Sequence, residues 1–371
     1  MTYSARATID AVRAFACPVC ESFAPFESRR CPTCQAELGL HVPTLSMIAT
    51  SEGAAVIDGS RWIHCTKSAS LGCNWLVPES QDKGHRGRCF ADSLIRTEPA
   101  ADDTIAQEKL ADTTTAMHRL ILQLLDLGLP VEPFWRTDGG LAFDLLSSYS
   151  EGKPVTIGHA NGVITIDLVE SLDAYRESLR VRLGEPYRTM LGHFRHEVGH
   201  YYQHVLVETG AGAVRYLHDC RELFGDERAD CQAEIARHYK FGPPDGWPES
   251  FISEYATMHP WEDFAECFAH YLHITDTIDT VREAGLVLQA DQVRFSVPRN
   301  IAPLESYDDA PIERLLYDWT WLALFFNRVN TAMGKNPLYP FVIPPPVISK
   351  LGFIHRVVRE TAHEQADTRS R

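Results

Sequence analysis

The chain has 371 residues, of which 44% are hydrophobic and 23% are charged, so it is long enough for two domains with apolar cores and is neither disordered nor fibrous. It carries 35 basic against 50 acidic residues, a net charge of −15. A surface of that charge repels phosphate backbones, which disfavours general nucleic-acid binding.

The distribution of cysteines indicates a metal-binding N-terminal region. Seven of the ten cysteines lie within the first 89 residues. The start of the chain shows no apolar signal-peptide segment, and no stretch approaches the roughly 20 apolar residues of a membrane span. We therefore expect a cytoplasmic protein that has reduced cysteines and does not bind a membrane.

The first cysteines form two C-x-x-C pairs separated by ten residues: Cys17, Cys20, Cys31 and Cys34. Four thiolates at this spacing fit one tetrahedral structural zinc, and iron in a rubredoxin-like site is the alternative. Four protein ligands leave no position for water, so we expect no chemistry at this site.

A second, less regular set predicts another structural zinc. It comprises Cys65, Cys73 and Cys89, with His85 four residues before the last cysteine. His85 can replace a thiolate in a site of three cysteines and one histidine, and His64 is a competing fourth ligand. The alternative is a set of three buried free cysteines.

These patterns suggest how the chain is organised. Residues 1–98 are predicted to form a zinc-ribbon-like domain with the two structural metal sites. Residues 99–115 are polar and acidic and are predicted to form a linker with some helix. Residues 116–371 then form the second domain.

The second domain is predicted to be mainly helical, with a small sheet. A helix with an apolar face runs on from Met117 until Gly128 and Pro130 end it. A β-hairpin follows, with strands at 155–157 and 162–168 around an Asn-Gly turn. Further helices are expected from near Pro186, from Asp226 as N-cap to residue 239, from Pro260, and over residues 312–330, followed by a Pro-rich turn and a polar tail.

The strongest chemical signal is an H-E-x-x-H motif formed by His196, Glu197 and His200. Two histidines four residues apart lie on one face of a helix, so both imidazoles can bind one zinc ion. Glu197 follows the first histidine directly, which suits a carboxylate that activates water as a general base.

A catalytic zinc also needs a third protein ligand and one open position. Gln203 and Leu206 stand where the metzincin extension of this motif requires glycine and histidine, so that class is excluded. The helix from Pro260 offers two candidates on one face, Glu262 and Glu266, and periodicity alone does not choose between them.

Three segments resemble the zinc-binding metallopeptidases of the gluzincin group: GEPYRTMLGHFRHEVGHYY, FGDERADC and HPWEDFAECFAHYLHI. The resemblance covers roughly Cys17 to Phe353 and includes an N-terminal zinc-ribbon-like region. It implies an α+β, zincin-like fold. It also implies that Glu262 binds the zinc and that Glu266 supports a ligand histidine. Tyr255, seven residues before Glu262, would face the oxyanion.

The resulting hypothesis is a zinc metallopeptidase with one catalytic zinc and one or two structural zinc ions. Metal-activated water would hydrolyse peptide bonds of a peptide or protein substrate, with Glu197 as the base and Tyr255 as a second catalytic group. Two alternatives stay open: a zinc-ribbon binding or scaffold protein, and a zinc amidohydrolase that acts on an isopeptide or a cell-wall cross-link.

Overall fold

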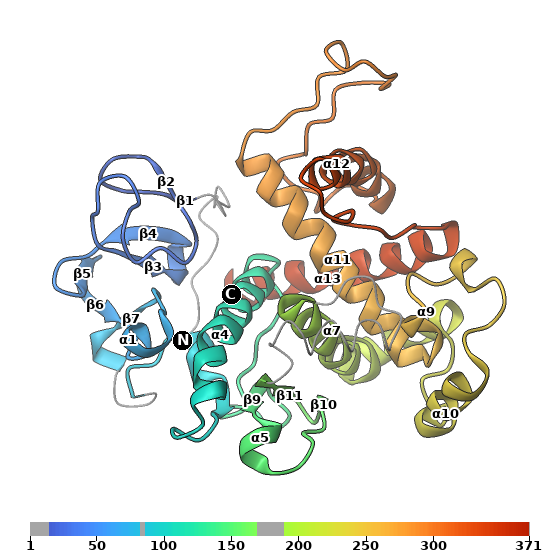
Figure 1. Ribbon diagram of the computed structural model, residues 1–371, viewed down its shortest axis with the longest axis horizontal. Helices are drawn as coiled ribbons and strands as arrows, with labels where there is room; N and C mark the ends of the chain where they lie inside the picture. Colours follow the sequence, from blue (N-terminus) through green and yellow to red (C-terminus); the bar gives the residue numbers. More distant parts are fainter. Residues whose placement is uncertain (1–14, 82–85, 169–188, 371) are drawn as a thin grey trace. The chain divides into compact units, whose positions relative to one another are not determined.

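The computed structural model describes residues 15–81, 86–168 and 189–370 (Figure 1). The chain divides into two compact units. Unit 1 comprises residues 1–175 and 364–371, and unit 2 comprises residues 176–363. In the described ranges, no helix is both long enough and apolar enough to span a lipid bilayer.

The cysteine-rich part of unit 1 is built from short antiparallel strands. The hairpin of β1 (Phe15–Ala16) and β2 (Phe23–Ala24) holds the first cysteine pair between its strands. Strands β3 (Leu38–His41) and β4 (Ser46–Ala49) pair around the 3-10 turn η1 (Val42–Thr44). A three-stranded sheet follows, made of β5 (Ala54–Ile57), β6 (Ser60–His64) and β7 (Leu76–Pro78). Three one-turn helices are interspersed: α1 (Ser68–Leu71), η2 (Glu79–Gln81) and α3 (Phe90–Ser93).

A mixed four-stranded sheet completes unit 1, in the order β10-β11-β9-β8. Its strands are β8 (Ile95–Thr97), β9 (Ala142–Leu146), β10 (Gly158–Ala160) and β11 (Val163–Asp167), with the short helix α5 (Ser148–Glu151) after β9. Strand β9 runs parallel to both β8 and β11. The sheet therefore joins segments from both sides of residue 98, and the division of the chain into domains stays a prediction.

The hairpin of β10 and β11 has the predicted turn, but its first strand is displaced. Asn161 and Gly162 have φ angles of 49° and 81°, the left-handed conformation that a two-residue hairpin turn requires. The strand predicted at 155–157 is wrong, because the paired residues are Gly158–Ala160. A two-residue turn fixes the register, so the strand must end directly before Asn161.

Helix α4 (Thr104–Asp126) begins earlier than the predicted helix. The Asp103 carboxylate caps it by accepting a hydrogen bond from Ala106 N at 2.9 Å. Apolar side chains continue along one face, so the segment 104–115 is helical, and the helix packs against α1 and α3.

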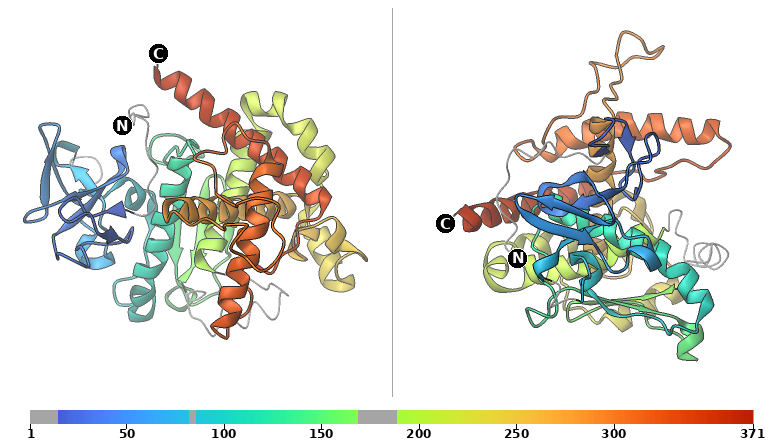
Figure 2. Two further views of the ribbon diagram at one scale, coloured as in Figure 1. Left: turned by 90° about the horizontal axis from the view of Figure 1, so that it is seen from above. Right: turned by 90° about the vertical axis from the view of Figure 1, so that its left-hand side faces the viewer.

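The named secondary-structure elements in the described part of unit 2 are all helices. Its elements are α7 (Met190–Tyr202), the π-helical η4 (Gln203–Glu208), α8 (Gly210–Arg215), α9 (Leu217–Phe224), α10 (Cys231–Phe241), η5 (Trp247–Glu249), η6 (Tyr255–Thr257), α11 (Pro260–Glu283), α12 (Ile312–Ala332) and α13 (Pro345–Ser370), the last of which ends beyond the unit. Between α11 and α12 the chain projects from the helices as a long loop (Figure 2). Small sheets in unit 1 and helices in unit 2 confirm a mixed fold of helices and small sheets.

Of the helix starts predicted in unit 2, one is wrong and another lies outside the described residues. Asp230, not Asp226, caps α10 by accepting from Ala233 N at 3.0 Å, because the Asp226 carboxylate instead binds Arg228. The expected start at Pro186 is in the range 169–188, which is not described; the described helix begins at Met190, where the hydroxyl of Thr189 caps Gly192 N.

The predicted polar tail is wrong, because α13 is a helix of 26 residues. Prolines are tolerated in the first turn of a helix, where a backbone N–H has no intrahelical partner. After these prolines, four apolar residues at helical spacing are buried: Val347, Leu351, Ile354 and Val358. The apolar face, and not the proline run, decides the structure of this segment.

Candidate metal centres

The first candidate site lies between α7 and α11, which pack side by side in unit 2 (Figure 1). Gly199 permits this close approach. A Cβ atom at Gly199 would lie 2.9 Å from Ala265 Cα, closer than real Cβ atoms come to backbone, and 3.1 Å from Ala265 O. The H-E-x-x-H helix therefore meets the helix that carries Glu262 and Glu266 at backbone contact distance.

A buried polar contact fixes the same pair of helices one turn earlier. Arg195, which is 3% exposed, binds Asp276 Oδ2 at 2.5 Å and donates to His273 Nδ1 at 2.7 Å. An uncompensated buried guanidinium is costly, so this contact favours one register between α7 and α11.

The packing brings three ligand-type atoms into one triangle. His196 Nε2 lies 3.0 Å from Glu262 Oε2, His200 Nε2 lies 3.2 Å from His196 Nε2, and His200 Nε2 lies 3.4 Å from Glu262 Oε2. A tetrahedral zinc with bonds of about 2.0–2.1 Å places its nitrogen and oxygen ligands about 3.3–3.4 Å apart. The three atoms thus fit one face of a zinc coordination tetrahedron.

Glu266 contacts the far side of the first histidine. Its Oε1 lies 2.8 Å from His196 Nδ1, and its Oε2 accepts a hydrogen bond from the Ser253 hydroxyl at 2.6 Å. A carboxylate on Nδ1 holds the proton there and leaves Nε2 free to bind a metal. Sequence reasoning missed Ser253, because no local pattern relates the loop before η6 to this helix.

The electrostatics of the cluster favour a cation. Burial lowers the pKa of His196, but the hydrogen bonds to Glu262 and Glu266 outweigh that effect and raise it well above its usual value. Burial raises the pKa of Glu262, but the charge of His200 and the hydrogen bond to His196 hold it below its usual range. A site that draws a proton onto a buried imidazole also favours a divalent cation.

Of the two predicted catalytic side chains, Tyr255 contacts a ligand histidine, and Glu197 follows His196 directly on α7. Glu197 is 5% exposed and its Oε1 is 3.7 Å from His193 Nε2. Tyr255 opens η6, is half-buried, and packs its ring edge-on against His196 with the ring centroids 5.6 Å apart.

A buried ion pair anchors α11 beside the candidate site. Lys350 Nζ lies 2.6 Å from Asp263 Oδ2 and also donates to Ser250 O at 2.9 Å. The ammonium group lies over the ring of Phe251, 4.3 Å from its centroid. Both charges are nearly inaccessible, and each compensates the other, so the residue next to Glu262 is held by α13.

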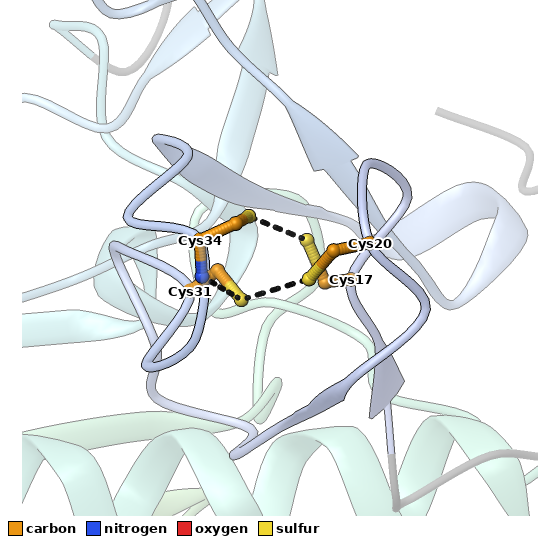
Figure 3. A group of neighbouring side chains, drawn as sticks. All are labelled: Cys17, Cys20, Cys31 and Cys34. Carbon is orange, nitrogen blue, oxygen red and sulfur yellow. Dashed lines mark hydrogen bonds between the residues drawn. The ribbon is translucent and has the colours of Figure 1, made fainter.

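The second candidate site is the four-cysteine cluster in unit 1, where the side chains of Cys17, Cys20, Cys31 and Cys34 point toward one another (Figure 3). Cys17 Sγ lies 3.7 Å from Cys34 Sγ, and Cys20 Sγ lies 3.6 Å from Cys31 Sγ. Four sulfurs around a zinc at about 2.3 Å are about 3.8 Å apart. The backbone N–H groups of Val19 and Cys34 point at two of the sulfurs, as they do around thiolate ligands.

The structure also brings together the three cysteines of the second predicted set, Cys65, Cys73 and Cys89. His85 lies outside the described residues. His64 Nε2 lies 3.3 Å from Thr50 Oγ1 and 3.5 Å from Glu37 Oε1, so this nitrogen contacts residues outside the cysteine cluster. The fourth ligand-type group beside the cysteines is Asp92, which the sequence analysis missed.

Comparison with known proteins identifies the two parts of the chain. Residues 106–357 match the family described as "Putative zinc-binding metallo-peptidase", and residues 14–103 match a zinc-ribbon domain. The chain is 41% identical to the uncharacterized protein Rv2568c of Mycobacterium tuberculosis (strain ATCC 25618 / H37Rv) and to the uncharacterized protein Mb2598c of Mycobacterium bovis. In both cases the alignment covers 97% of this chain and 99% of the relative. No solved structure matches significantly. The chain therefore belongs to this zinc-binding metallopeptidase family and carries an N-terminal zinc ribbon.

Proposed function

We propose that the protein is a zinc-dependent peptidase with a zincin-like, gluzincin-type helical domain. The observation that carries the proposal is the triangle of His196 Nε2, His200 Nε2 and Glu262 Oε2, with edges of 3.0–3.4 Å. Three protein ligands leave one coordination position for water or substrate, which is the arrangement of catalytic zinc sites.

The roles of the acidic residues follow from their positions. Glu262 is the third ligand, because its Oε2 faces both Nε2 atoms. Glu266 faces Nδ1 of His196, so it orients that imidazole and keeps its proton on the side away from the zinc. Ser253 in turn holds the second oxygen of Glu266.

Bound zinc would supply a Lewis acid that polarises the substrate carbonyl and acidifies a water molecule. Glu197, one residue after the first ligand, accepts the proton of the attacking water and returns it to the leaving nitrogen. Tyr255, whose ring lies edge-on to His196, would donate a hydrogen bond to the oxyanion.

The substrate class is a peptide or protein, since the family is a peptidase family. We place the protein in the cytoplasm, where a reducing environment keeps zinc-binding thiolates available. Hydrolysis of an isopeptide or a cell-wall cross-link would use the same residues. The choice of substrate in the test distinguishes this amidohydrolase activity from peptidase activity.

The test compares wild-type protein, Glu197→Gln and Glu222→Gln on a proteome-derived peptide library. Glu222 is an exposed glutamate of α9, so its substitution is a matched control. We expect equal cleavage by wild type and the control. Glu197→Gln should keep its zinc and lose about 10²–10⁴-fold in rate, because the amide cannot accept the proton.

Two results would contradict the proposal. Cleavage by Glu197→Gln at the wild-type rate would remove the general-base role. If zinc-loaded wild type left every library peptide intact but hydrolysed isopeptide-linked or cross-linked peptides, the amidohydrolase alternative would replace peptidase activity.

A further inference from the structure

The second cysteine cluster is a closed, buried group of four side chains in unit 1. Cys65, Cys73, Cys89 and Asp92 are between 0% and 2% exposed. Asp92 Oδ2 lies 3.0 Å from Cys65 Sγ and 3.2 Å from Cys89 Sγ, and Cys73 Sγ lies 3.7 Å from Cys89 Sγ. One ligand atom from each residue falls within 4.8 Å of all the others.

These distances fit a metal with three sulfur ligands and one oxygen ligand. The sulfur–sulfur distance of 3.7 Å equals one edge of the four-cysteine cluster. Zinc with bonds of about 2.3 Å to sulfur and about 2.0 Å to oxygen would place S and O about 3.5 Å apart. An outward shift of a few tenths of an ångström by Asp92 Oδ2 therefore admits the ion.

Backbone N–H groups surround the sulfurs as they do in the four-cysteine cluster. Cys65 Sγ accepts from Lys67 N at 3.4 Å and from Cys89 N at 3.1 Å, and Cys89 Sγ accepts from Asp92 N at 3.3 Å. Three buried cysteines that served only to fill the core would not need a carboxylate among them, since burying a charge is costly without compensation.

The other oxygen of Asp92 is held from a different part of the chain. His118 Nε2, on α4, donates to Asp92 Oδ1 at 2.8 Å, and His118 is 5% exposed. Carboxylates that bind a metal are themselves hydrogen-bonded, which fixes the oxygen that faces the ion. With Oδ1 held by His118, Oδ2 faces the sulfurs of Cys65 and Cys89.

We propose that Asp92 is the fourth ligand of a second structural zinc, together with Cys65, Cys73 and Cys89, and that His118 of α4 is the positioning residue for its carboxylate. Cys89 and Asp92 then form a C-x-x-D counterpart of a C-x-x-C pair, at the start of α3. Through His118, which lies within the peptidase family match, this zinc would tie α4 to the ribbon.

The ligand test counts metal in full-length protein by elemental analysis and loads cobalt in place of zinc. Asp92→Ala should lose one equivalent, whereas His85→Ala should lose none. Asp92→Cys should keep the metal and add an eighth thiolate to the seven of the two ribbon sites. Its sulfur-to-cobalt charge-transfer absorption should therefore rise by about one seventh.

The Asp92→Cys arm keeps the proposal testable if Asp92→Ala fails to fold. The proposal is overturned if His85→Ala loses the equivalent, if Asp92→Ala retains it, or if Asp92→Cys binds metal without added charge-transfer absorption. A wild-type count of two, with the four-cysteine site and the helical site both loaded, overturns it as well.

His118 is tested by graded chelator challenge, read as zinc equivalents retained. His118→Ala should weaken the second ribbon site by about 10–100-fold, the usual effect of losing the partner of a metal ligand. His118→Gln retains an N–H donor and should restore most of that affinity. Equal retention by His118→Ala and wild type, or no recovery in His118→Gln, would contradict the positioning role.

Discussion

The four-cysteine cluster of the ribbon and the helical His-Glu cluster hold metal-binding groups in opposite ways. In the ribbon, four sulfurs from two short turns enclose the centre, and backbone N–H groups occupy the positions around them. In the helical cluster, two rigid helices supply three ligand atoms on one side. A closed shell stabilises a fold, whereas an incomplete shell on a rigid support leaves a position for chemistry. The difference predicts distinct responses to mutation.

The largest expected effect is the loss of the catalytic zinc in Glu262→Ala. The carboxylate supplies one of only three protein ligand atoms, so its removal should abolish zinc binding at this site almost entirely. Elemental analysis should show one equivalent fewer than wild type, with both ribbon sites retained. A full zinc complement in this variant would show that another group is the third ligand.

A smaller effect is expected for Glu266→Ala. This carboxylate contacts His196 Nδ1 and not the ligand-atom triangle, so zinc affinity should fall by about 10–100-fold. Chelator titration measures the change. If Glu266→Ala lost the zinc entirely and Glu262→Ala only weakened its binding, the assignment of ligand and supporting carboxylate would be reversed, although the peptidase hypothesis would survive.

Gly199→Ala tests whether the helix contact builds the site. The new methyl group would meet the backbone of Ala265, so overpacking should cost about 1–3 kcal/mol of stability and separate the histidines from Glu262. Thermal unfolding measures the loss of stability, and zinc affinity measures the separation of the ligands. Gly352→Ala in α13 is the control, because the atom nearest to a Cβ there is the side-chain methyl Ile312 Cγ2 at 3.1 Å and not a backbone atom. Equal effects of the two substitutions would argue against the close-contact account.

The smallest effect on the helical site is expected for Cys31→Ser. Loss of one of four ligands should destabilise the ribbon, and hydrogen exchange should accelerate in residues 15–64 while α7 and α11 stay protected. Cys231→Ser, a cysteine outside the three clusters, is the control. Faster exchange in α7 with an unchanged ribbon would contradict a purely structural role for this metal.

The residues of the helical candidate site could be named from the sequence because their signals are local. The spacing of His196 and His200 requires only that the segment be a helix, and the acidic pair of α11 follows the same periodicity. The proposed choice of Glu262 over Glu266 rests on the register of two helices, and that register depends on Gly199 and on the Arg195–Asp276 pair.

The parts that sequence reasoning missed depend on tertiary contacts. Asp92 cannot be told from the other acidic residues until its burial beside three cysteines is known. His118, which contacts it from α4, is 26 residues further along the chain. The cap of α10 was misassigned because Asp226 and Asp230 are equally suitable by composition, and the contact with Arg228 decides between them.

The most direct test of the central contrast is a crystal structure of the zinc-loaded protein, with anomalous data at the zinc edge. We expect the helical zinc to be bound by His196, His200 and Glu262 at about 2.0–2.2 Å, with one non-protein ligand. The ribbon zinc ions should each have four protein ligands. A helical zinc bound by four protein groups, or a ribbon zinc with a water ligand, would contradict the division into an open catalytic site and closed structural sites.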